Sequence, residues 1–401
     1  MTLNKLLYTL IAIIVLSSCG GSKITKTLRQ GNVVQKDFKV SIPFEYRKGL
    51  IILKVTIQDK TYDFLLDSGA TNVISTELAS ELKTVKLGVK EITDIHNKSE
   101  QLSYVKLNDI QLGGINFRET ITTVIDIKNR ELSCLNIDGF IGANLMRFAV
   151  WDFDFENQLI TITNDESKLN IPSDAEVNTS KLFIDTGSVA SIITKVNGDR
   201  VLNNKIDLGN NSNVLLTYIT FSEQKKSNKI SNYKKGSGIT SIGAFGKGES
   251  KDQYFAEISE IQIGNHIIKD KIVRVRDGSS NLGIAFFKNY RLILNWKTKK
   301  LKMIQKGTAL NTDLYGFGFN PNLEENKLYV GFLYNETKAS NVLQLGDQIQ
   351  QINNVDYTYI NNEKKCEYFN NGYFNGTEEI VITVIRNGKK LNFQLKKEEL
   401  L

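Results

Sequence analysis

Phe64-Leu-Leu-Asp67-Ser-Gly-Ala70 and Leu182-Phe-Ile-Asp185-Thr-Gly-Ser188 are the two stretches that decide the fold. In both, apolar residues lead to an aspartate, a hydroxyl residue and a glycine. This pattern predicts a strand that enters a turn. One such motif alone is typical of a simple turn, in which the Asp side chain binds the next backbone amides. Two copies in one chain point instead to an internal repeat.

Two further pairs of segments support the repeat, because they follow in the same order. Residues 107–114 match residues 258–265, and residues 140–146 match residues 281–287. The offset between copies is 118 for Asp67 and Asp185, 151 for the second pair and 141 for the third. Matched blocks in one order predict two homologous lobes that differ in their loops. Short, alternating, β-branched segments predict that both lobes are mainly β.

The paired aspartates predict a hydrolytic centre. If the lobes pack about a pseudo-twofold axis, Asp67 and Asp185 face each other and share one proton, because two like charges so close cannot both form easily. One carboxyl then acts as general base on water and the other as acid toward a scissile carbonyl. The only two histidines, His96 and His266, have neither metal-ligand spacing nor a triad pattern.

The paired Asp-Ser/Thr-Gly motifs, each with a later apolar-apolar-Gly segment, resemble the aspartic proteases of the pepsin and retropepsin clan over about residues 37–306. The resemblance implies a two-lobed β fold with the active site between the lobes, and an endopeptidase that acts on protein or peptide substrates without cofactor or metal. It implies that Asp67 and Asp185 are the catalytic pair. The active-site loops would be supported by Ser68, Gly69, Ala70, Thr186, Gly187, Ser188, Gly142 and Gly283.

Within that resemblance, the hydroxyls of Ser68 and Thr186 would brace the two loops against each other. Family members often carry a hydroxyl after the glycine that binds a catalytic carboxylate. Ala70 lacks it, so we expect Asp67 to be less acidic and activity to lie nearer neutral pH than in pepsin.

The family covers its cleft with a glycine-tipped hairpin. The equivalent stretch in the first lobe, residues 89–102, contains no glycine, whereas residues 236–246 of the second lobe are glycine-rich. Which lobe closes over substrate therefore stays open.

The C-terminal segment has a different pattern. Tyr315-Gly-Phe-Gly-Phe319, followed by Leu343-Gln-Leu-Gly346-Asp347, resembles a PDZ domain. The resemblance implies that Gly316, Phe317, Gly318 and Phe319 form a loop that holds the carboxylate of a C-terminal peptide ligand. The alternative is a domain that only packs on the protease.

The N-terminus resembles a bacterial lipoprotein signal. Lys5 precedes an apolar run over residues 6–16, which is too short for a permanent membrane span. Leu16-Ser-Ser-Cys19 resembles a lipobox, which implies lipidation of Cys19 and membrane anchoring in the bacterial cell envelope, on the periplasmic face or the cell surface. An ordinary signal peptide that contains a cysteine is the alternative.

Cysteine and charge content restrict the remaining possibilities. Cys134 and Cys366 fall in different predicted domains, so we expect no disulfide and two buried apolar side chains. The net charge is +7, but Lys and Arg are scattered, which argues against nucleic-acid binding.

The predicted organisation is a signal peptide (1–19), a linker (20–36), lobe 1 (37–168), lobe 2 (169–306) and a PDZ domain (307–401). Because one chain supplies both lobes, we expect a monomer. The alternative to an enzyme is a catalytically silent or single-target envelope protein that uses the cleft and the PDZ groove for docking. The intact Asp and Gly residues favour the enzyme.

Overall fold

A computed structural model describes residues 27–94, 96–129, 131–239, 242–243, 245–306, 314–374 and 376–401. The predicted signal peptide and Cys19 lie outside the described residues. Within those ranges, no helix is both long and apolar enough to cross a bilayer. The fold is mainly β, as the sequence predicts.

Lobe 1 is built on one sheet with strand order β3-β4-β5-β10-β6-β9-β8-β7, and β4 also pairs with β8. Its strands are β1 (Asn32–Val33), β3 (Glu45–Arg47), β4 (Leu50–Ile57), β5 (Lys60–Asp67), β6 (Val73–Ser75), β7 (Lys86–Thr93), β8 (Ser99–Leu112), β9 (Ile115–Ile125) and β10 (Gly139–Gly142). Its helices are α3 (Thr76–Glu81), η1 (Glu131–Leu135) and α4 (Ala143–Met146). The Ser75 hydroxyl caps α3 by accepting from the Leu78 N–H.

Lobe 2 repeats this order strand for strand, as β14-β15-β16-β23-β17-β22-β21-β18. Its strands are β14 (Phe183–Ile184), β15 (Ala190–Val196), β16 (Arg200–Asp207), β17 (Val214–Thr217), β18 (Tyr233–Gly238), β19 (Ile242–Gly243), β20 (Gly246–Lys247), β21 (Lys251–Ile263), β22 (His266–Arg276) and β23 (Asn281–Gly283). Its helices are α5 (Tyr218–Lys226) and α6 (Ile284–Phe287). Thr217 caps α5 as Ser75 caps α3. The matched order identifies equivalent residues in the two lobes.

A six-stranded sheet joins the lobes, in the order β13-β25-β24-β11-β12-β2. Its strands are β2 (Lys39–Pro43), β11 (Val150–Asp154), β12 (Leu159–Thr163), β13 (Val177–Lys181), β24 (Tyr290–Asn295) and β25 (Lys300–Gln305); the short helix η2 (Glu166–Lys168) follows β12. Each lobe contributes three strands. The central pair, β11 and β24, is antiparallel with Trp151 opposite Leu294, so the pseudo-twofold axis passes between these two strands. One apolar core runs through both lobes.

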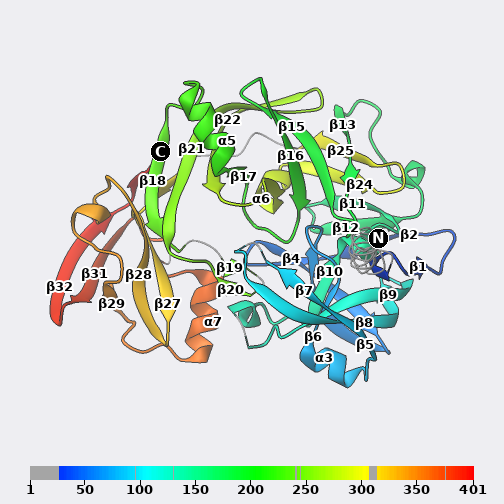
Figure 1. The fold of residues 1–401 in the computed structure, drawn as a ribbon, viewed down its shortest axis with the longest axis horizontal. Coiled ribbons are helices and arrows are strands. Elements are labelled where there is room, and N and C mark those ends of the chain that lie inside the picture. The colour runs from blue at the N-terminus through cyan, green and yellow to red at the C-terminus, as the bar shows by residue number, and fades with distance from the viewer. Residues whose placement is uncertain are drawn as a thin grey trace, which may run out of the picture.

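The C-terminal domain has an apolar core of its own and is drawn in orange and red in Figure 1. It contains β26 (Tyr315–Gly316), β27 (Phe319–Glu324), β28 (Lys327–Tyr334), η3 (Ala339–Asn341), β29 (Gln348–Ile352), β30 (Val355–Asp356), α7 (Asn362–Asn371), β31 (Glu379–Arg386), β32 (Lys389–Lys396) and β33 (Glu398–Glu399). Strand β28 pairs with β18 of lobe 2, with Ser237 opposite Leu333. The domain therefore extends the sheet of lobe 2.

A disulfide joins this domain to lobe 1, which corrects the expectation that the two cysteines are unpaired. Cys134 of η1 and Cys366 of α7 are bonded, with 4.8 Å between their Cα atoms. The side chain of Asn370 also donates to the Cys134 carbonyl, at 3.4 Å. The expectation failed because it treated separate domains as distant ones, whereas α7 packs directly on η1 (Figure 1).

Candidate active site

Two aspartates end equivalent strands of the two lobes. Asp67 ends β5, and Asp207 ends β16. Beside each runs a short parallel strand that ends in glycine: Gly142 lies opposite Asp67, and Gly283 lies opposite Asp207. The two predicted support glycines thus occupy equivalent places, one in each lobe.

The two carboxyl groups occupy one shared site. The Gly69 N–H donates to Asp67 Oδ1 at 2.8 Å. A Cβ atom built on Gly69 would lie 2.7 Å from Asp207 Oδ1 and 3.2 Å from Asp67 Oδ1. On the opposite loop, a Cβ atom built on Gly209 would lie 2.3 Å from Asp67 Cγ. Each carboxyl therefore lies against the glycine of the other lobe's loop, as expected about a pseudo-twofold axis.

The structure corrects the predicted pairing, because Asp67 faces Asp207 and not Asp185. Asp185 is exposed, in the turn between β14 and β15. Its Oδ1 accepts from the Val189 N–H at 2.8 Å, and its own N–H donates to the Val189 carbonyl at 3.0 Å. The second motif is thus a hairpin turn, equivalent to the turn at Lys48 between β3 and β4 of lobe 1.

The neighbours of Asp185 belong to the same turn. Thr186 is exposed, and Gly187 lies at the edge of the lobe 1 loop, where an added Cβ atom would be 3.6 Å from Thr71 Cγ2. Ser188 is buried with a φ of 71°, and its carbonyl accepts from Trp296 Nε1 at 2.8 Å. None of these three residues is placed to support either carboxyl of the shared site.

Asp207 was missed because its motif is Asp207-Leu-Gly209, without the hydroxyl residue. The signal that identifies it is the spacing of the repeat. Asp67 and Asp207 are 140 residues apart, close to the 141 residues between Gly142 and Gly283. The offset of 118 for Asp185 disagrees with that value and implies a large insertion that the structure does not contain.

Ser68 braces the two loops, as predicted for it. Its hydroxyl donates to the Ile206 carbonyl at 2.7 Å and accepts from the Leu208 N–H at 3.0 Å, and its side chain is fully buried. Leu208 occupies the equivalent position in lobe 2 and has no hydroxyl, so lobe 2 returns no such hydrogen bond to the loop of lobe 1. Thr186, the predicted partner, takes no part.

The two carboxyls differ in electrostatic environment. Burial, and then the negative charge of Asp207, raises the pKa of Asp67 to about 7, although the Gly69 and Ala70 N–H groups act against the rise. The raised pKa agrees with the expectation that Asp67 is less acidic, but its causes are burial and the charge of Asp207.

Asp207 lies in more favourable surroundings for a negative charge. Burial also raises its pKa, but the positive charges of Arg276 and Lys205 oppose the rise. Hydrogen bonds from the Gly209 N–H and the Asn210 side chain oppose it further. Asn210 follows Gly209 as Ala70 follows Gly69, so a polar side chain beside the carboxylate is present only in lobe 2.

Two hairpin tips meet between the lobes, near the centre of Figure 1. One joins β7 to β8, and the other lies between β18 and β21. The Phe245 N–H donates to Asp94 Oδ2 at 3.1 Å, and Lys98 Nζ donates to the Lys247 carbonyl at 2.7 Å. Both predicted flap candidates therefore contribute to this contact.

The C-terminal domain touches the same region. Lys247 Nζ donates to the carbonyl of Leu323 in β27. In the predicted peptide-binding loop, Gly316 pairs with Glu398 near the end of the chain. Phe317 and Phe319 are buried and contact the ring of Phe374. Gly318 has a φ of 78°, and a Cβ atom there would lie 2.7 Å from Thr337 Oγ1.

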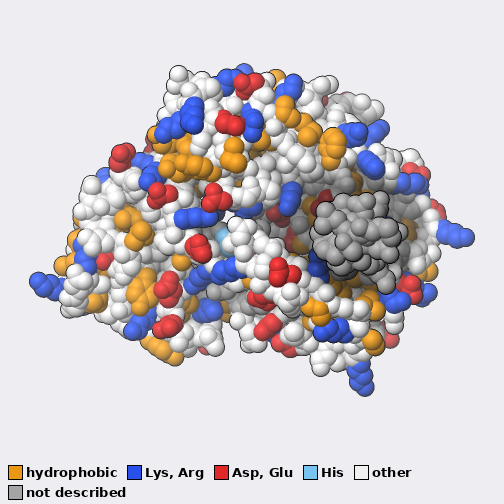
Figure 2. All heavy atoms as spheres, in the orientation of Figure 1, with side chains coloured by type: hydrophobic (Ala, Val, Ile, Leu, Met, Phe, Trp, Pro, Cys, Tyr) orange, Lys and Arg blue, Asp and Glu red, His pale blue; other side chains and the backbone are white. Residues whose placement is uncertain are grey.

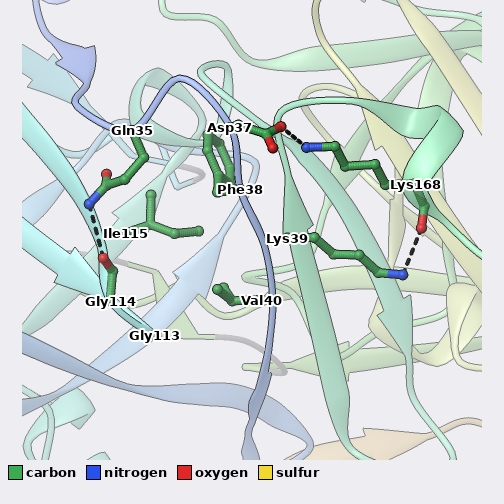
Figure 3. A pocket seen from close by; sticks show the side chains of 9 residues that line it. All are labelled: Gln35, Asp37, Phe38, Lys39, Val40, Gly113, Gly114, Ile115 and Lys168. Carbon is green, nitrogen blue, oxygen red and sulfur yellow. Dashed lines mark hydrogen bonds and ion pairs between the residues drawn. The ribbon is translucent and has the colours of Figure 1, made fainter.

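A separate hollow of about 550 Å³ lies at the start of β2, and neither Asp67 nor Asp207 lines it. Figure 3 shows its polar rim, where Gln35 binds the Gly114 carbonyl and Lys168 pairs with Asp37. Elsewhere on the face drawn in Figure 2, Lys and Arg are spread among Asp and Glu.

Comparison with known proteins agrees with this geometry. Residues 53–145 match the family model described as aspartyl protease. The match begins within β4, ends within α4 and includes Asp67 and Gly142, so this part of the chain is similar to an aspartyl protease domain. A search of curated proteins found no match.

Proposed function

We propose that this chain is an aspartic endopeptidase whose catalytic pair is Asp67 and Asp207. The observation that carries the proposal is the reciprocal packing of each carboxyl against the other loop's glycine. Two half-buried carboxyls at one site share a proton, because ionising both is too costly. That arrangement supplies a base and an acid to one reacting centre.

The chemistry follows from the shared proton. The ionised carboxylate takes a proton from a bound water as the water oxygen attacks the carbonyl carbon of a peptide bond. The protonated carboxyl gives its proton to the carbonyl oxygen, and a neutral tetrahedral diol forms. Proton transfer to the amide nitrogen then lets the C–N bond break, which yields a carboxylic acid and an amine and restores one proton to the pair.

The test is cleavage of an unfolded-protein or peptide library from acid to neutral pH by the chain without residues 1–19. Asp67→Asn and Asp207→Asn should each reduce cleavage by roughly 10³-fold or more, because either change removes the shared proton. Asp185→Asn is the matched control and should cleave like the parent.

Two outcomes would contradict the proposal. Loss of cleavage in Asp185→Asn with activity retained in Asp207→Asn would show that the catalytic pair is Asp67 and Asp185. A parent that cuts nothing at any pH, even with a C-terminal peptide present, would favour the catalytically silent or single-target docking protein.

We also propose that the protein is an exported lipoprotein anchored through Cys19, and that residues 307–401 are a PDZ domain that binds a C-terminal peptide. The Cys134–Cys366 bond supports export, because disulfides persist in oxidising compartments. Strand β27 pairs only with β28 among the described strands, and its other edge, where Lys247 Nζ binds the Leu323 carbonyl, supports peptide addition at that edge. Globomycin-sensitive processing and C-terminal peptide binding would test these two proposals separately.

A further inference from the structure

The two lobes differ at one position beside the catalytic strands. In lobe 1, Phe140 lies opposite Leu65, two residues before Asp67. In lobe 2, Asn281 lies opposite Lys205, two residues before Asp207. Phe140 and Asn281 are therefore equivalent in register, and an apolar ring in one lobe is replaced by an amide in the other.

The amide of Asn281 contacts the catalytic carboxyl directly. Its Nδ2 donates to Asp207 Oδ2 at 3.0 Å, and only 1% of the residue is exposed. The opposite oxygen, Oδ1, is the one that faces Gly69. A buried amide donor strengthens its hydrogen bond when the acceptor carries a charge. Asn281 thus favours the ionised form of Asp207 from the side away from Asp67.

The positively charged groups around Asp207 act in the same direction as Asn281. Arg276 ends β22, where its lobe 1 equivalent is Ile125 at the end of β9. Lys205 on β16 adds a second positive charge, and the negative charge at the site comes from Asp67 on β5. Lobe 2 therefore supplies polar or positively charged groups where lobe 1 supplies apolar ones.

We propose that Asn281 is a positioning residue that keeps Asp207 ionised, so that the shared proton resides on Asp67. Asp207 is then the base that deprotonates water, and Asp67 is the acid that protonates the scissile carbonyl. This assignment of roles rests on the proposed peptidase activity.

The test is the pH dependence of kcat/KM. In Asn281→Leu the acid limb, which reports the group that must be ionised, should move up by about one pH unit. Asn281→Asp keeps the shape and adds a negative charge, so its shift should be at least as large. At pH values well above the acid limb, the kcat/KM of both variants should approach that of the parent.

Phe140→Leu is the matched control, because it changes the equivalent position in lobe 1, where the side chain has no hydrogen-bond donor for Asp67. Its acid limb should stay in place even if its stability falls. An equal loss of kcat/KM at every pH in both Asn281 variants, or an equal shift in Phe140→Leu, would overturn the proposal.

A second readout separates failure of this proposal from failure of the proposed activity. Titration of the aspartate carboxyl carbons by NMR needs no substrate. Asp207 should titrate at a lower pH than Asp67 in the parent, and its midpoint should rise by about one unit in Asn281→Leu. If the parent has no peptidase activity but this shift appears, Asn281 still controls which carboxyl of the pair holds the proton. An unchanged Asp207 midpoint in Asn281→Leu refutes the proposal.

Discussion

At the residue scale, the site tolerates no side chain at Gly209. A methyl group there would lie 2.3 Å from Asp67 Cγ, closer than any real van der Waals contact. One carboxyl or the loop itself must move.

We therefore expect Gly209→Ala to lower kcat/KM by about 10²-fold or more, because small displacements of reacting groups are costly. Gly187→Ala is the matched control from the exposed turn, where the nearest atoms would be 3.4 and 3.6 Å away. It should retain parental activity. Steady-state kinetics on one peptide substrate compares the two, and similar losses in both would contradict the assignment.

The raised pKa of Asp67 also predicts how stability depends on pH. The folded protein holds a proton on Asp67 up to about pH 7, whereas the unfolded chain releases it near pH 4. The folded state therefore binds more protons between these values, and its stability falls as the pH rises through them.

Asp67→Asn removes the fall in stability that ionisation of Asp67 causes. The substitution should therefore stabilise the protein more at pH 8 than at pH 4, with a difference of roughly 2–4 kcal/mol. Urea unfolding of parent and variant at the two pH values measures it. A pH-independent effect of Asp67→Asn would mean that Asp67 does not titrate abnormally.

The sequence identified the members of the site that carry a recognisable motif. Asp67, Ser68 and Gly69 lie where the pattern placed them. Asp207 was not recognised, because Leu208 occupies the buried position where the motif has a hydroxyl residue. Asp185 was chosen because it has the full motif, although that motif lies in a turn. Local sequence describes a turn equally well at both places, and only the register of the whole repeat distinguishes them.

At the scale of elements, Ser68 connects the end of β5 to the end of β16. Ser68→Ala would leave the Leu208 N–H and the Ile206 carbonyl buried without this partner. We expect a loss of roughly 2–4 kcal/mol of unfolding free energy.

Thr186→Ala is the control for this prediction, because its hydroxyl is exposed. It should change stability by less than about 0.5 kcal/mol. Equal effects of the two substitutions in urea unfolding would show that the brace does not stabilise the lobe interface.

Repeat spacing also explains which elements were predictable. The glycine-ended strands β10 and β23 follow from the matched segments Phe140-Ile-Gly142 and Asn281-Leu-Gly283. Only glycine fits at the ends of these strands, because a Cβ atom on either residue would strike backbone. The contact between hairpin tips was not predictable. It depends on Asp94 and Phe245 meeting across the lobes, and no local pattern encodes that distance.

At the scale of the whole molecule, the C-terminal domain is attached to both lobes. It extends the sheet of lobe 2 through β28 and is bonded to lobe 1 through Cys366. The rule that separate domains do not share a disulfide failed for this reason.

Cys134→Ser together with Cys366→Ser should lower the unfolding free energy by roughly 2–5 kcal/mol, since the bond closes a loop of 232 residues. Hydrogen exchange should rise first in α7. Reduction of the parent is the control and should reproduce the variant. Two free thiols in the folded, unreduced parent would contradict the bond itself.

The same bond makes residues 134–366 a closed covalent ring. Asp207 lies within the ring, and Asp67 lies on the N-terminal tail outside it. A single backbone cut anywhere inside the ring opens it without releasing a fragment. A nicked molecule should therefore run as one species on a non-reducing gel and as two after reduction, and a peptidase that cuts itself there would keep both aspartates on one covalent molecule.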